Sequence, residues 1–143
     1  METSTLTMTR EHWWTVPLRS IQDYRGNLTP IEGGVDIGFE IARVYYIYDI
    51  PGGSHRAGHA HRRLRQLYIA ASGSFDVTLT DGARRETVSL NRPDMGLQIG
   101  PGVWRDITNI SAGAVCLVLA SAHYDEDDYI RHFEDFQQLY VPQ

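Results

Sequence analysis

The sequence has a single cysteine, no excess of positive charge and no long apolar run. Cys116 lies in the apolar segment AVCLVLA, so the chain forms no internal disulfide and this thiol is expected to be a buried, small hydrophobic group. With a formal net charge of −5, the chain has no global basic field for nucleic acid or an anionic membrane. No run approaches the roughly 20 residues of a membrane helix, and no signal peptide is recognisable. We therefore expect a cytoplasmic protein.

What the chain does contain is a series of short apolar segments separated by Gly, Pro, Asn and Asp. They recur roughly every 8 to 12 residues, a spacing typical of an all-β sandwich or barrel. Residues 74–90 predict a hairpin that turns at Asp81-Gly82. Residues 125–140 have apolar side chains at helical spacing behind Asp125, a good N-cap residue, and predict a short C-terminal helix. The length prior favours a single domain over residues 1–143.

The segment RAGHAHRRLRQ, residues 56–66, places two histidines two positions apart in a predicted strand. Strand residues i and i+2 point to the same face, roughly 6–7 Å apart, so His59 and His61 are expected to face the interior of a small barrel together. An imidazole titrates near pH ~6.5, which suits it to proton transfer at neutral pH. The alternative is a pair of ordinary core or surface histidines.

The spacing around this pair resembles the two motifs of the cupin superfamily, whose fold is a jelly-roll barrel. From His59 the first motif reads H-x-H-x4-Q-x6-G, and the second contains PGVWRDITN. The metal-binding cupins offer three His and one Glu, whereas here Gln66 stands at the Glu position and Arg105 at the third His position. An amide is a poor ligand, and a permanent cation cannot ligate. We therefore expect no metal and no other cofactor; two histidines and an amide holding a metal with water remain the alternative.

Further segments in the same order narrow the resemblance. RVYYIYDIP, RAGHAHR, SGSFDVTLTDG, GLQIGPGVWRDI and YDEDDYIR are together similar to the sugar-nucleotide 3,4-ketoisomerases, the FdtA and QdtA type of the WxcM-like C-terminal domain family. The resemblance runs from about Ile21 to Phe136, with Ala57 and Gly58 in the reverse of the usual order. It implies dTDP-4-keto-6-deoxyglucose as substrate and a homodimer that exchanges N-terminal strands. Trp13 and Trp14 would then pack on the partner; packing in their own core is the alternative.

The chemistry can be stated from the reaction itself. Moving a ketone from C4 to C3 removes a proton from C3, passes through an enediol or enediolate, and returns a proton to C4. His59 is the expected base, His61 is expected to assist or orient it, and Tyr45 is expected to donate to the sugar oxygens. Arginines suit the diphosphate and the developing negative charge. The expected substrate-binding residues are Arg25, Arg43, Arg56, Arg62, Gln66, Arg105 and Ser121.

Three other functions are compatible with a cupin barrel: a nucleotide-sugar 3,5-epimerase, a non-catalytic cupin that binds a nucleotide sugar, and a metal-dependent dioxygenase. The face on which C4 is protonated decides between a gluco- and a galacto-configured product. Arg25 and Arg105 bear on that choice, and the two do not match one known subgroup. We expect the gluco product.

Overall fold

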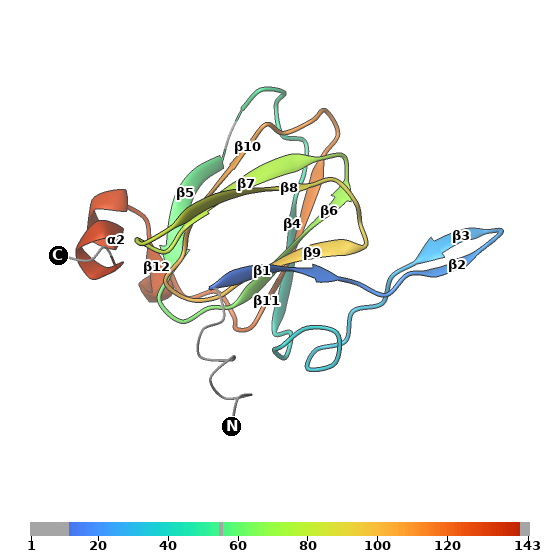
Figure 1. The fold of residues 1–143 in the computed structure, drawn as a ribbon, viewed down its shortest axis with the longest axis horizontal. Helices are drawn as coiled ribbons and strands as arrows, with labels where there is room; N and C mark the ends of the chain where they lie inside the picture. The colour runs from blue at the N-terminus through green and yellow to red at the C-terminus, as the bar shows by residue number, and fades with distance from the viewer. Residues whose placement is uncertain (1–11, 55, 141–143) are drawn as a thin grey trace.

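The computed structural model describes residues 12–54 and 56–140 and consists mainly of two antiparallel five-stranded sheets that face each other (Figure 1). The first sheet has the order β1 (Trp13–Pro17), β9 (Met95–Ile99), β6 (Gln66–Ser72), β11 (Val115–Ala120), β4 (Arg43–Ile47). The second has the order β12 (Tyr129–Ile130), β5 (Arg56–His61), β10 (Trp104–Thr108), β7 (Phe75–Thr80), β8 (Arg85–Leu90). The prediction of an all-β, cupin-like fold with one short C-terminal helix is confirmed.

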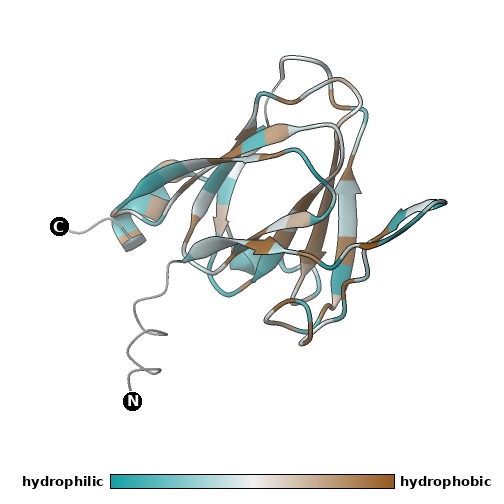
Figure 2. Ribbon diagram, turned by 45° about the vertical axis from the view of Figure 1, so that its right-hand side comes forward, coloured by the Kyte–Doolittle hydropathy of each residue, from teal (hydrophilic) through white to brown (hydrophobic). Residues whose placement is uncertain are grey.

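A hydrophobic core fills much of the space between the sheets. Strand β7 shows why the sequence folds this way: Phe75, Val77 and Leu79 are buried, and the residues between them are partly exposed. Burying each such side chain stabilises the fold by roughly 1.5–3 kcal/mol. Figure 2 shows apolar segments concentrated in the strands of the two sheets. Tyr68 of β6 belongs both to this core and to the wall of a large cavity, so core packing holds the cavity wall in place.

The outer face of the first sheet is also covered. Ile37 and Phe39, from the connection that precedes β4, pack against Leu67 and Ile69 of β6. Strand β6 is therefore buried on both faces along most of its length, which explains why its sequence lacks the alternation of a half-exposed strand.

Two short strands, β2 (Ile21–Asp23) and β3 (Gly26–Leu28), form a hairpin that projects from the body of the molecule (Figure 1). Three of its apolar side chains are exposed, and Tyr24 at its tip is 98% exposed.

Trp13, in strand β1, is buried in the core of its own chain, because β1 pairs with β9 here. The exchange of an N-terminal strand between two copies stays a prediction.

The predicted helix over residues 125–140 is wrong in its first half. Asp125 does cap a helix, but it is the 3₁₀-helix η1 (Glu126–Asp128), which leads directly into β12; only α2 (Phe133–Tyr140) is α-helical. Tyr129 and Ile130 pair with His61 and Ala60 of β5 instead of continuing a helix. Long-range strand pairing thus overrides the local helical spacing. Across the part of the chain that the structure describes, no helix is long and apolar enough to span a membrane.

Candidate active site

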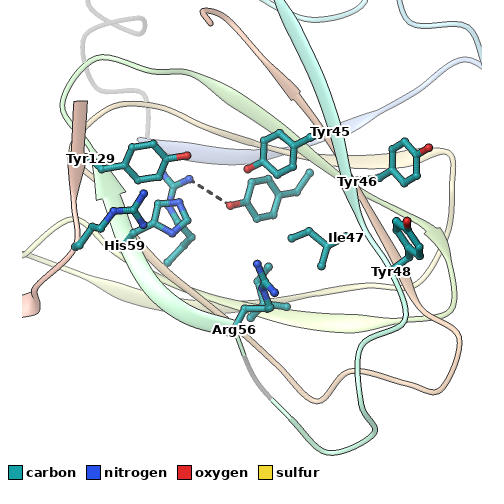
Figure 3. Close-up of a pocket in the computed structure, with 11 residues that line it drawn as sticks. Tyr45, Tyr46, Ile47, Tyr48, Arg56, His59 and Tyr129 are labelled. Atoms are coloured by element: carbon teal, nitrogen blue, oxygen red, sulfur yellow. Dashed lines mark hydrogen bonds between the residues drawn. The ribbon is translucent and has the colours of Figure 1, made fainter. Parts of the chain in front are cut away.

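A cavity of about 770 Å³ opens between the two sheets. Strand β4 lies on one side of it, and strands β5 and β10 lie on the other. Figure 3 shows Tyr45 and Ile47 pointing into the space that His59, Arg56 and Tyr129 face. Its lining is aromatic and basic: Tyr45, Tyr46, Ile47, Tyr48, Arg56, His59, Tyr68, Arg105, Ile107, Tyr129 and Arg131. Such a cavity, with aromatic walls and a few convergent polar groups, has the character of a small-molecule site.

The two histidines of β5 form the centre of the site. Their rings meet edge to face, with centroids 4.9 Å apart, so both lie on the same side of the strand. His59 lines the cavity, whereas His61 is fully buried behind it against Tyr129, at 4.4 Å between ring centroids. Strand alternation therefore places the two rings together but in two layers, one facing the cavity and one supporting it.

Asp128 holds the inner histidine in one tautomer. His61 Nδ1 lies 3.1 Å from Asp128 Oδ2, and the same buried carboxylate accepts backbone N–H groups from Arg63 at 2.7 Å and Leu64 at 3.3 Å. An ionised carboxylate only accepts hydrogen bonds, so Nδ1 carries the hydrogen and Nε2 carries the lone pair. Within residues 12–54 and 56–140, Nε2 of His61 has no hydrogen-bond partner.

Burial, and next the charge of Arg105, hold the pKa of His61 well below its usual value. The folded protein therefore leaves His61 neutral where the unfolded chain would bind a proton, below about pH 6.5. Protonation of the unfolded chain at this residue therefore lowers the free energy of unfolding as the pH falls below about 6.5, by up to about 1.4 kcal/mol per pH unit. Urea unfolding is expected to show this slope between about pH 6 and 5 and little of it between about pH 7.5 and 6.5, and His61→Gln is expected to flatten it. Equal slopes for the two proteins would contradict a neutral His61.

Arg105 of β10 is buried and anchors a second network. Its Nη1 donates to Gln66 Oε1 at 2.5 Å, and Gln66 Nε2 donates to the Tyr45 hydroxyl at 3.0 Å. The guanidinium also donates to the Val103 carbonyl and to Tyr68, the latter bond drawn dashed in Figure 3. Arg105 lies directly opposite His59 in the pairing of β10 with β5. A fixed positive charge thus sits beside the histidines.

This arrangement does not fit a bound metal ion. Among the described residues, no three His, Cys, Asp or Glu side chains gather as a potential metal site. The position of the third cupin His is occupied by a guanidinium, which cannot ligate and which repels a divalent cation.

The other predicted binding residues are spread over several places. Arg56 lines the cavity. The Arg43 guanidinium lies 5.3 Å from the Tyr45 ring centroid, and its Nε and Nη2 are buried without a hydrogen-bond partner in the described part of the chain. Ser121 accepts the backbone N–H of Arg65 and, with Arg43, lines a separate pocket of about 80 Å³.

Three more predicted residues do not line the cavity. Gln66 is fully buried behind Tyr45 and Arg105, and Arg62 is exposed. Arg25 lies on the projecting hairpin, paired with Asp23 at 2.6 Å (Figure 1). Within one chain, Arg25 and the cavity belong to different parts of the molecule.

Sequence reasoning missed Asp128 and several residues of the cavity lining: Tyr46, Ile47, Tyr48, Tyr68, Ile107, Tyr129 and Arg131. Tyr68 had a usable signal, because it stands two positions after Gln66 in the same strand and shares its face. Asp128 had no such signal, because it is one of four consecutive acidic residues at the start of a predicted helix.

Comparison with known proteins agrees with this geometry. Residues 12–141 match the family model described as FdtA: WxcM-like, C-terminal. A TDP-4-oxo-6-deoxy-alpha-D-glucose-3,4-oxoisomerase of Aneurinibacillus thermoaerophilus is 42% identical over 123 residues, which cover 86% of this chain and 88% of that protein.

Two solved structures are similar in both sequence and fold. The WlaRB TDP-quinovose 3,4-ketoisomerase of Campylobacter jejuni is 45% identical with a TM-score of 0.86, over 90% of this chain and 99% of that one. A mutant of the 3,4-ketoisomerase QdtA of Thermoanaerobacterium thermosaccharolyticum, in complex with TDP-4-keto-6-deoxyglucose, is 39% identical with a TM-score of 0.89, over 92% and 96%. The chain therefore belongs to the FdtA, WxcM-like C-terminal family, as its sequence motifs predicted.

Proposed function

We propose that this chain is a 3,4-ketoisomerase that converts dTDP-4-keto-6-deoxyglucose into the corresponding 3-keto-6-deoxy sugar. The observation that carries the proposal is one cavity in which His59, Tyr45 and Arg105 converge. Relatives at 39 to 45% identity are named as 3,4-ketoisomerases or the equivalent oxoisomerase, which supports the same reaction here.

The reaction begins at C3, whose proton is acidified by the neighbouring C4 carbonyl. His59, at the cavity wall, takes that proton, and the C–H electrons pass into the C3–C4 bond while the carbonyl oxygen gains negative charge. Arg105 and Tyr45 face this oxygen and stabilise its charge, one as a fixed cation and the other as a hydroxyl donor. The O3 hydroxyl proton passes to O4, which becomes the C4 hydroxyl, and the C3 carbonyl forms as C4 takes a proton from protonated His59. No net oxidant or reductant is required.

Buried His61 supports this exchange without touching the cavity. Its ring lies against His59, and its Nδ1 hydrogen is engaged by Asp128. A neutral His61 adds no positive charge beside His59, the proposed base. We assign His61 the role of orienting His59.

The nucleotide half of the substrate is assigned to the part of the cavity lined by Arg56 and Arg131. Arg56 offers a planar donor group to a diphosphate, and Arg131 offers the N–H groups that its ion pair with Glu126 leaves over. Tyr46 and Tyr48 lie beside each other with ring centroids 5.7 Å apart and are exposed, which suits stacking with a thymine base. The gluco configuration of the product stays a prediction.

We further propose that the enzyme is a homodimer. Ile21, Tyr24 and Leu28 leave apolar surface exposed on the β2–β3 hairpin. A second copy that covered this hairpin would bury that surface and give Arg25 a route to the partner's cavity. Sedimentation velocity is expected to give twice the monomer mass; a monomer at catalytic concentrations would exclude the arrangement.

The test of the function is an NMR time course with dTDP-4-keto-6-deoxyglucose in D₂O. A 3-keto sugar with deuterium at C4 is expected, at the same rate after treatment with a chelator. Deuterium at C5 as well as C3 would indicate an epimerase, and an unchanged sugar that still binds would indicate a non-catalytic cupin. A chelator-sensitive rate restored by a divalent ion would overturn metal independence.

A further inference from the structure

The direction of one buried hydrogen bond decides what Tyr45 can do. Gln66 lies between Arg105 and Tyr45, with its Oε1 2.5 Å from Arg105 Nη1 and its Nε2 3.0 Å from the Tyr45 hydroxyl. Gln66 is fully buried, so water does not compete for either contact. From the sequence, Gln66 was expected to bind substrate. In the structure its side chain instead makes these two contacts within the protein.

The chemistry of the three groups permits only one orientation of the amide. A guanidinium has donors and no acceptor, so the amide must turn its oxygen toward Arg105. Its NH₂ group then faces Tyr45, and the Tyr45 oxygen accepts. Because the oxygen of Tyr45 already accepts a hydrogen bond from the protein, its own hydrogen is free for another partner. Tyr45 lines the cavity, so this hydrogen is available to a molecule bound there.

A second observation agrees with this orientation. Burial raises the pKa of Tyr45 above its usual value, so the phenol keeps its hydrogen across the neutral range. Arg105 is held in place from the other side by the carbonyl of Val103, which keeps its Nη1 directed at the amide. The direction of the two hydrogen bonds, from Arg105 to Gln66 and from Gln66 to Tyr45, is therefore fixed.

We propose that Gln66 is a positioning residue that holds Tyr45 as a hydrogen-bond donor to an oxygen of the bound sugar. The proposal rests on the ketoisomerase function above, in which that oxygen gains charge. A glutamate at this position, as the cupin spacing carries, would reverse the bond: its carboxylate would accept from Tyr45 and withdraw the hydrogen from the cavity. Gln66, at the position of a metal ligand in the cupin pattern, thus orients the hydroxyl group of Tyr45.

The experiment compares Gln66→Glu, Gln66→Leu, Tyr45→Phe and the double variant Q66E/Y45F, each checked for folding by its thermal midpoint. We expect Q66E to lower kcat by about 10²- to 10³-fold, the effect of losing one donor to a developing oxyanion, with the Kd for TDP little changed. We expect Q66E/Y45F to be no slower than Y45F alone, because Gln66 acts through Tyr45.

Gln66→Leu separates direction from packing. Leucine removes both hydrogen bonds and leaves Arg105 without its acceptor, so a purely structural role predicts that Q66L loses more activity than Q66E. Our proposal predicts the opposite order, because only glutamate actively draws the Tyr45 hydrogen away. Losses from Q66E and Y45F that multiply in the double variant, or a Q66L slower than Q66E, would overturn it.

A readout independent of turnover separates this inference from the proposed function. The side-chain NH₂ resonance of Gln66 is expected to differ between the wild type and Y45F, whatever sugar the enzyme uses. This measurement does not need the Q66E variant, so it still tests the hydrogen bond if Q66E does not fold. An unchanged resonance would overturn the hydrogen-bond direction, whereas a wild-type protein that leaves the keto sugar unchanged would overturn the proposed function alone.

Discussion

His59→Asn is expected to reduce kcat by about 10²- to 10⁴-fold, the contribution of a general acid–base group, while the Kd for TDP changes little. His59 lines the cavity and lies directly opposite Arg105, so this substitution removes the group that we propose accepts the C3 proton and returns it to C4. The measurement is single-turnover NMR or coupled kinetics with the keto sugar, together with calorimetric binding of TDP. Deuterium exchange at C3 is expected to be lost with turnover.

The matched control is His132→Asn, which changes an exposed histidine outside the cavity lining. This variant is expected to retain wild-type kcat. Activity of H59N within a few-fold of the wild type would remove His59 from the role of base and would transfer that role to another group at the cavity, with Tyr45 the first to examine.

Asp128→Asn is expected to lower kcat by about 10²-fold or more, although the side chain never reaches the cavity. The carboxylate accepts three N–H groups with its two oxygens, whereas an asparagine has only one oxygen. With that oxygen kept on the Arg63 backbone, its NH₂ must face His61 Nδ1 and donate to it. The His61 hydrogen then moves to Nε2, where the described structure offers no acceptor.

The tautomer is read directly from ¹⁵N NMR of His61, a signal that a merely structural role would not move. We expect the hydrogen on Nδ1 in the wild type and on Nε2 in D128N, with kcat falling and KM nearly constant. Asp125→Asn is the matched control, because Asp125 caps the same 3₁₀ turn and is exposed. An unchanged His61 tautomer with full activity in D128N would show that Asp128 only stabilises the turn.

Local sequence patterns predicted the structural features that depend only on residues close together in the chain. The alternation of β7 and the i, i+2 placement of His59 and His61 follow from strand geometry alone, because successive side chains of a strand point to opposite faces. The family also followed from motifs whose spacing is local, and the comparisons confirm it.

Local patterns failed where distant segments meet. Residues 129 and 130 carry helical spacing, yet pairing with β5 makes them a strand. Gln66 was expected to face the substrate, yet it is closed in by Tyr45 from β4 and Arg105 from β10. Neither outcome is visible in the segment that contains the residue, because the deciding partner belongs to another strand.

The sequence by itself determined the all-β class, the family, the shared face of the two histidines and the replacement of two cupin ligands by an amide and a cation. Only the tertiary structure decided which nitrogen of His61 carries its hydrogen and which way the amide of Gln66 faces. The physical reason is that both are set by hydrogen bonds to remote partners, Asp128 at a separation of 67 residues and Arg105 at 39. Residue type supplies the donors and acceptors, and folding alone assigns each of them a partner.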